Sequence, residues 1–185
     1  MTTFKIHTVE SAPEGSKPIL EQLKNGIGFV PNLAATMANA PVVLKTYATM
    51  AGIFGEGSFS PVERELIMMT TSYINECTYC MAAHSTLAKA QGAIDEVLGA
   101  VRSGNLPDDS RLAALVSFTR EVACNGGEVS EKDVRHFLDA GFSQTQLLEV
   151  LIGVTQSSLA SLVHRLGSVP VDEGFQTQAW AAKAS

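Results

Sequence analysis

Several features are scarce in this sequence, and each scarcity excludes a class of protein. The 185 residues contain only three cysteines, which do not make the disulfide framework of a small secreted protein. Residues 1–7 lack the apolar stretch of a signal peptide, and no later segment approaches the uncharged run of about 20 residues that a membrane span requires. We therefore expect a cytoplasmic protein with no membrane partner.

Clustered positive charge is also missing. The 13 lysines and arginines are scattered along a chain of net charge −6, so no surface for phosphate backbones is indicated and a nucleic-acid partner is not expected. Strand-like alternation of apolar and polar residues is nearly absent. With 45% hydrophobic residues, the chain suits one all-α domain over residues 1–185, with a polar C-terminal tail from about residue 168.

Signals for the start and end of helices occur throughout. The strongest is Ser60-Pro61-Val62-Glu63, which combines an N-cap serine, a first-turn proline and a capping-box glutamate. It predicts a nearly buried helix that breaks at residues 75–76, followed by a second helix from about Cys77 to Ala90. Further helices are expected from residue 16 to Gly26, over 42–54, 93–101 and 111–124, and in segments that begin at Ser130 and Ser143 and end at Gly141 and Gly167.

Two weaker patterns concern the arrangement of these helices. Phe59-Ser60 before one long apolar helix is echoed by Phe142-Ser143 before another, which hints at a duplicated helical hairpin. Trp180 favours docking of the polar tail rather than fraying. Apolar residues on more than one face of several helices predict subunit contacts, and hence a homo-oligomer.

The segment Cys77-Thr-Tyr-Cys80-Met-Ala-Ala-His84 carries the most chemistry. On a helix, its two thiols and its imidazole fall within about 60° of arc and share one face. Helix-terminal amide dipoles and a nearby histidine both favour the thiolate over the thiol. A thiolate that attacks a peroxide becomes a sulfenic acid, and a second thiol one turn away condenses with it to a disulfide. The motif therefore indicates redox chemistry.

The cysteine pair has other interpretations. The two residues could be small buried hydrophobes, but packing gives no reason for a histidine on the same face. Zinc is a second alternative, in which the three residues leave a fourth ligand position that Cys124, His136 or His164 could fill only through a tertiary contact. A thioredoxin-type motif is excluded, since it joins a strand to a helix in a βαβ unit.

Glu65 lies beyond the first turn of the preceding helix and is followed by Leu66, Ile67, Met68 and Met69. It should therefore be partly buried. A carboxylate in such a place pairs with a cation or orients a histidine, and we assign it to the site.

Glu65, Cys77, Cys80 and His84 together resemble the Glu…Cys-x-x-Cys-x-x-x-His signature of AhpD-like alkylhydroperoxidases, in the carboxymuconolactone decarboxylase superfamily. The spacing of twelve residues from Glu65 to Cys77 also matches, and residues 60–65, 82–84 and the Val30-Pro31-Asn32 segment look like its peroxidase-related branch. The resemblance implies an AhpD-like all-α fold in trimers or hexamers. It also implies that Cys80 attacks, that Cys77 is its partner, and that Glu65 and His84 relay protons.

The chain departs from the best-known branch at Tyr79, where that branch has a histidine beside the second cysteine. A phenol shuttles protons less readily than an imidazole near neutral pH. We predict a thiol peroxidase that reduces organic hydroperoxides or hydrogen peroxide with no metal or organic cofactor, and that an external dithiol or protein reductant regenerates. The alternatives are a lyase of the decarboxylase type, which the cysteine pair disfavours, and a non-catalytic thiol sensor of oxidants.

Overall fold

Every regular element in the described part of the chain, residues 4–182, is helical in the computed structural model. This confirms the all-α prediction. The elements in chain order are α1 (Lys17–Ile27), α2 (Asn32–Met37), α3 (Pro41–Gly55), α4 (Pro61–Ile74), α5 (Thr78–Ala90), α6 (Asp95–Arg102), α7 (Ser110–Cys124), α8 (Glu131–Asp139), α9 (Gln144–Gly167) and a 3₁₀ helix η1 (Glu173–Gln178).

Helices α4 and α9 begin at complete capping boxes. At α4, the Ser60 hydroxyl accepts from the Glu63 backbone N–H at 3.3 Å, and the Glu63 carboxylate accepts from the Ser60 N–H at 2.8 Å. Ser143 and Gln146 form the same pair of bonds at α9. The Phe59 and Phe142 rings that precede these caps lie 5.9 Å apart. The echo in the sequence thus marks two helix starts that meet in space, while duplication itself stays a prediction.

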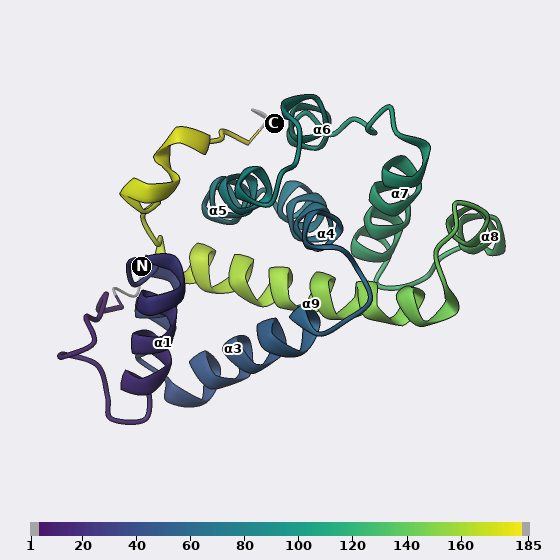
Figure 1. The fold of residues 1–185 in the computed structure, drawn as a ribbon. Helices are drawn as coiled ribbons and strands as arrows, with labels where there is room; N and C mark the ends of the chain where they lie inside the picture. The colour runs from purple at the N-terminus through teal and green to yellow at the C-terminus, as the bar shows by residue number, and fades with distance from the viewer. Residues whose placement is uncertain (1–3, 183–185) are drawn as a thin grey trace.

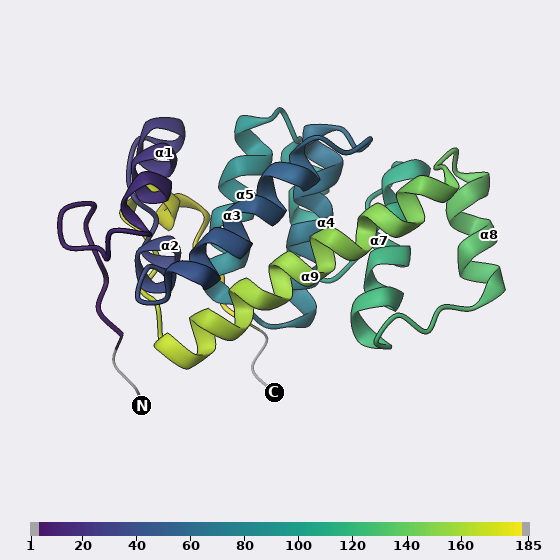
Figure 2. The same ribbon diagram turned by 90° about the horizontal axis from the view of Figure 1, so that it is seen from below.

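α9 is the helix on which the others are arranged. It runs along one side of the molecule, with α3 beside it and the α4–α5 pair above (Figures 1 and 2). A Cβ added at Gly153 would lie 2.6 Å from Ile67 of α4 and 2.9 Å from Phe54 of α3. Glycine at this point therefore lets three helices approach closely around the core.

By length and composition alone, α9 is also the one helix among residues 4–182 that could cross a membrane. It packs against α2, α3, α4, α5 and α7, as a helix of a folded domain does. Glu149, which accepts from the Ser58 backbone N–H at 2.9 Å, ties its first half to the loop before α4.

A tight connection places α4 and α5 side by side. Residues 75–76 break the helix as predicted, and Glu76 adopts a positive φ of 50°. The chain then reverses, and the Cys77 N–H donates to the Ser72 carbonyl at 2.9 Å. This turn brings the first half of α4, which carries Glu65, next to the middle of α5, which carries His84.

Two segments differ from the sequence prediction. α1 continues past Gly26 and ends at Gly28, whose φ of 94° and N–H bond to the Lys24 carbonyl make it the true helix stop. α2 was not predicted. Its first amide, at Asn32, donates to the distant carboxylate of Asp172 at 3.0 Å, so the helix start depends on a residue at the other end of the chain.

The C-terminal segment docks on its own chain. Val169 and Phe175 are buried, and the Trp180 indole donates to the Arg102 carbonyl at 2.9 Å. Figure 1 shows η1 and the following residues packed beside α5 and α6. This part of the tail is therefore held in place, as Trp180 predicted; residues 183–185 lie outside the described range.

Candidate active site

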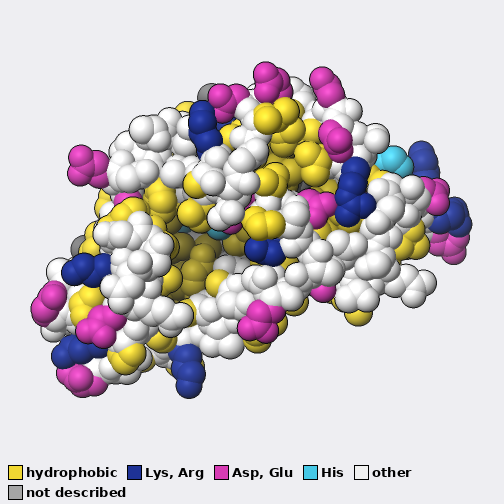
Figure 3. Space-filling view, in the orientation of Figure 1, with side chains coloured by type: hydrophobic (Ala, Val, Ile, Leu, Met, Phe, Trp, Pro, Cys, Tyr) yellow, Lys and Arg dark blue, Asp and Glu magenta, His cyan; other side chains and the backbone are white. Residues whose placement is uncertain are grey.

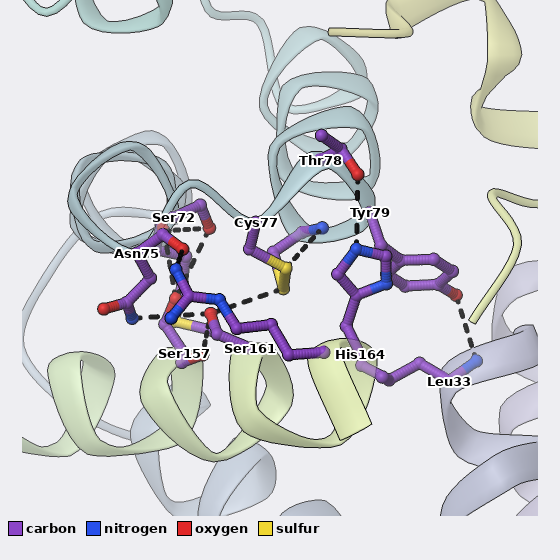
Figure 4. Close-up of a disulfide and its surroundings, with 12 residues drawn as sticks. Leu33, Ser72, Asn75, Cys77, Thr78, Tyr79, Ser157, Ser161 and His164 are labelled. Atoms are coloured by element: carbon purple, nitrogen blue, oxygen red, sulfur yellow. Dashed lines mark hydrogen bonds between the residues drawn. A yellow bond between two sulfur atoms is a disulfide. The ribbon is translucent and has the colours of Figure 1, made fainter. Parts of the chain in front are cut away.

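Cys77 and Cys80 are joined by a disulfide at the start of α5. Cys77 is the N-cap, and its sulfur accepts from the Cys80 backbone N–H at 3.2 Å (Figure 4). Both residues are buried. Because the free amides and the positive end of the helix dipole face this turn, the position stabilises negative charge on sulfur once the disulfide is reduced.

Serine hydroxyls of α9 line the other side of the disulfide. The Cys80 sulfur lies 3.8 Å from the Ser161 hydroxyl oxygen, and that hydroxyl donates to the Ser157 carbonyl at 2.8 Å. Asn75, at the break before α5, reaches the same serine from the opposite side at 3.4 Å (Figure 4). The surroundings of Cys80 are therefore polar and buried on this side, and α9 supplies most of them.

Glu65 and His84 form a hydrogen-bonded pair. Glu65 Oε2 lies 2.8 Å from His84 Nδ1, and both side chains are mostly buried. Glu65 is partly buried, as the sequence predicted, and of the two partners expected for it, a cation or a histidine, it contacts the histidine. Since Nδ1 is occupied by the carboxylate, Nε2 is the nitrogen left for exchange with another group.

A cavity of about 240 Å³ joins these groups. Cys80, His84 and Glu65 line it, whereas Cys77 does not contribute to its wall. Most of the remaining wall is apolar and comes from α1 to α5, with Phe175 from η1. The molecule is hollowed near the middle of the face in Figure 3, and the walls of the hollow are largely hydrophobic. Of the two cysteines, only Cys80 can therefore meet a molecule in the cavity.

Tyr79 is engaged away from proton transfer. Its buried hydroxyl donates to Asp172 at 2.6 Å and accepts from the Leu33 N–H at 3.3 Å. Burial and this carboxylate raise the pKa of Tyr79 far above its ordinary value. The tyrosine that replaces the second histidine thus connects α5 to α2 and to the C-terminal segment.

Other residues considered from the sequence lie apart from the disulfide or have separate partners. Cys124 is exposed near the end of α7, and His136 is exposed on α8. His164 Nε2 lies 3.2 Å from the Thr78 hydroxyl, and burial lowers the pKa of this imidazole. Within residues 4–182, no three His, Cys, Asp or Glu side chains converge as metal ligands do.

Three polar residues that line the cavity were not predicted as site residues from the sequence. They are Tyr47 of α3, Arg64 of α4 and Gln156 of α9. Gln156 left a signal, since it is a polar residue on the same helical face as Gly153 and Ala160, both of which are buried. Tyr47 and Arg64 left none, because only the packing of α3 against α4 and α9 turns them towards the site.

Comparison with known proteins agrees with this geometry. Residues 41–121 match the sequence model of the carboxymuconolactone decarboxylase family, and this range contains Glu65, Cys77, Cys80 and His84. No functionally curated protein matches the chain.

Several solved structures share the fold. A peroxidase-related protein with an alkylhydroperoxidase AhpD core, from Ralstonia eutropha JMP134, is 20% identical and superposes with a TM-score of 0.82 over 93% of each chain. A peroxidase-related protein from Silicibacter sp. TM1040 has the same identity and TM-score over 96% of this chain and 95% of its own. The debrominase Bmp8, in complex with 2,3,4-tribromopyrrole, is 13% identical, with a TM-score of 0.79 over 96% of each chain.

The matched segment carries the whole Glu65, Cys77, Cys80 and His84 set, and the fold around it is AhpD-like. Residues 41–121 thus match the carboxymuconolactone decarboxylase family, and the chain as a whole is similar in fold to AhpD-like proteins.

Proposed function

We propose that this protein is a thiol peroxidase that cycles between a Cys77/Cys80 dithiol and the disulfide. The observation that carries the proposal is the position of Cys80, which shares one cavity with the Glu65–His84 pair and is bonded to a cysteine outside that cavity. The peroxide can then reach the Cys80 sulfur from the cavity, while Cys77 reaches the same sulfur from the opposite, protein-filled side.

The reaction balances without a cofactor. The Cys80 proton passes to His84 Nε2, with Glu65 holding the ring through Nδ1. The thiolate attacks the outer peroxide oxygen, so that an S–O bond forms and the O–O bond breaks. The leaving alkoxide takes the proton from His84 and departs as an alcohol. The Cys77 thiol then condenses with the sulfenic acid, which releases water and forms the disulfide.

Regeneration needs an external reductant. Two electrons and two protons from a dithiol, or from a protein that carries one, return the disulfide to its reduced form. The cytoplasmic location and the homo-oligomer expected from the sequence stay predictions of the same proposal.

The cavity favours organic hydroperoxides over hydrogen peroxide. Its wall is mainly aliphatic and aromatic, and includes Leu23, Leu33 and Phe54. Burial of an alkyl or aryl group against such a wall contributes about 25 cal/mol per Å² of apolar surface. Hydrogen peroxide has no group that could use this contribution, so we expect a lower kcat/KM for it.

The test compares three cysteine variants in a peroxide assay with a dithiol reductant. Cys80→Ser should abolish turnover, and Cys77→Ser should reduce it strongly because the sulfenic acid loses its partner. Cys124→Ser removes an exposed thiol outside the site and should leave the rate unchanged. Equal rates for Cys80→Ser and the unmodified protein would exclude the mechanism.

Thiol alkylation and the number of turnovers separate the peroxidase from the two alternatives, a lyase and a thiol sensor. A lyase of the decarboxylase type would keep its activity after thiol alkylation, whereas the peroxidase would lose it. A thiol sensor would be oxidised once per Cys77/Cys80 pair and would not turn over, even with excess reductant.

A further inference from the structure

The cavity holds a pair of polar side chains that the proposed thiol chemistry does not use. Tyr47 projects from α3 and Gln156 from α9, and both line the wall that carries Cys80. Gln156 is only 5% exposed, and among the described residues its Oε1 atom has no hydrogen-bond partner. A buried acceptor without a donor costs roughly 1–3 kcal/mol, so its presence in a ligand-sized cavity points to a ligand that donates to it.

Gln156 and Tyr47 line the same cavity wall. The Gln156 side chain lowers the pKa of Tyr47, as a group does that favours the ionised phenol, while Gln156 Oε1 has no hydrogen-bond partner among the described residues. We therefore infer that the amide nitrogen of Gln156 is turned toward the phenol and that Oε1 is left to accept from a ligand. The Tyr47 hydroxyl carries its own proton, which it can donate to a ligand.

Tyr47 keeps that proton at neutral pH. Burial raises the pKa of Tyr47, and the Gln156 side chain beside it lowers this pKa by less. The negative charge of Glu65 raises the pKa of Tyr47 further. The wall therefore presents one donor, the Tyr47 hydroxyl, beside one acceptor, Gln156 Oε1.

We propose that Tyr47 and Gln156 form the binding site for the –OOH group of the substrate. The hydroperoxide proton is donated to Gln156 Oε1, and the Tyr47 hydroxyl donates to the inner peroxide oxygen, on which negative charge develops as the O–O bond breaks. The inference rests on the proposed peroxidase function and specifies how the substrate is held.

The two contacts should separate in kinetics. The Gln156 contact exists already in the bound substrate, so its loss should raise KM. The Tyr47 contact strengthens as charge develops, so its loss should lower kcat. Each loss should reduce kcat/KM roughly tenfold, as expected for one hydrogen bond of about 1.4 kcal/mol.

The experiment uses Tyr47→Phe and Gln156→Met, which keep the shapes of the side chains, with cumene hydroperoxide and a dithiol reductant. Tyr73→Phe is the matched control, because Tyr73 packs against Trp180 and does not line this cavity. A second readout is the rate at which iodoacetamide alkylates Cys80 in the reduced protein, since this reaction needs the thiolate but no peroxide.

The inference expects a tenfold lower kcat/KM in the two cavity variants, an unchanged control and alkylation rates within twofold of the unmodified protein. It is overturned if Tyr47→Phe and Gln156→Met reduce the peroxide at the unmodified rate. It is also overturned if alkylation slows as much as turnover, because the effect would then act on Cys80 itself. Should Gln156→Met fail to fold, Tyr47→Phe alone decides. An unmodified protein without peroxide turnover would refute the proposed function first, and the inference with it.

Discussion

Replacement of Tyr79 by phenylalanine should destabilise the protein and leave its peroxide chemistry intact. The change removes a hydroxyl that donates to the Asp172 carboxylate at 2.6 Å and accepts from the Leu33 N–H at 3.3 Å. The ring stays, so no cavity is created. Asp172 keeps the Asn32 N–H, which softens the loss. One buried hydrogen bond to a charged group is worth roughly 1.5–3 kcal/mol, and we expect a loss of about 2 kcal/mol.

Urea unfolding of the oxidised protein, followed by circular dichroism at 222 nm, measures this loss directly. Asp172→Asn and the double variant complete a cycle that should give a coupling energy of about 1 kcal/mol or more. The kcat/KM for cumene hydroperoxide should stay within threefold of the unmodified value. A stability change below about 0.5 kcal/mol would refute the stabilising role of the Tyr79 hydrogen bonds. A hundredfold loss of activity would show that Tyr79 takes part in the reaction.

Three further predictions concern the relay, the core and the dependence on pH. Glu65→Gln removes the charge that holds His84, and should lower kcat/KM for cumene hydroperoxide about 100-fold while iodoacetamide still labels Cys80. Gly153→Ala forces a Cβ against Ile67 and Phe54, and should lower the unfolding free energy by about 1–3 kcal/mol in urea titrations. Burial lowers the pKa of His164, so the unfolded chain binds its proton first as pH falls. Stability should therefore drop below about pH 6.5, and His164→Gln should flatten that part of the curve.

The sequence was sufficient where structure depends on neighbours in the chain. The capping box of Ser60 and Glu63 and the end of α5 at Ala90 could be predicted because their hydrogen bonds join residues a few positions apart. Cys77, Cys80 and His84 share one helix, so their common face followed from its period. Glu65 needed only the adjacent helix.

The rest depended on contacts between distant segments. α2 begins where Asp172, 140 residues away, accepts its first amide. The Tyr79 hydroxyl donates to the same carboxylate, 93 residues away. Comparison of motifs could therefore show that a tyrosine stands in place of a histidine, but not which group the phenol binds. Tyr47 and Gln156 share a cavity with Cys80 only because α3 packs against α9, and α9 packs against α5. No pattern within a single segment of the sequence predicts that these three residues line one cavity.

The central claim is that Cys80 attacks the peroxide, and trapping its sulfenic acid tests this most directly. Cys77→Ser removes the resolving thiol, while serine still caps α5. The reduced variant is treated with one equivalent of cumene hydroperoxide and then with dimedone, and the labelled residue is read by peptide mass spectrometry. The account predicts one dimedone adduct on Cys80. Peroxide consumed without label on Cys80, or with label on Cys124 alone, would contradict it.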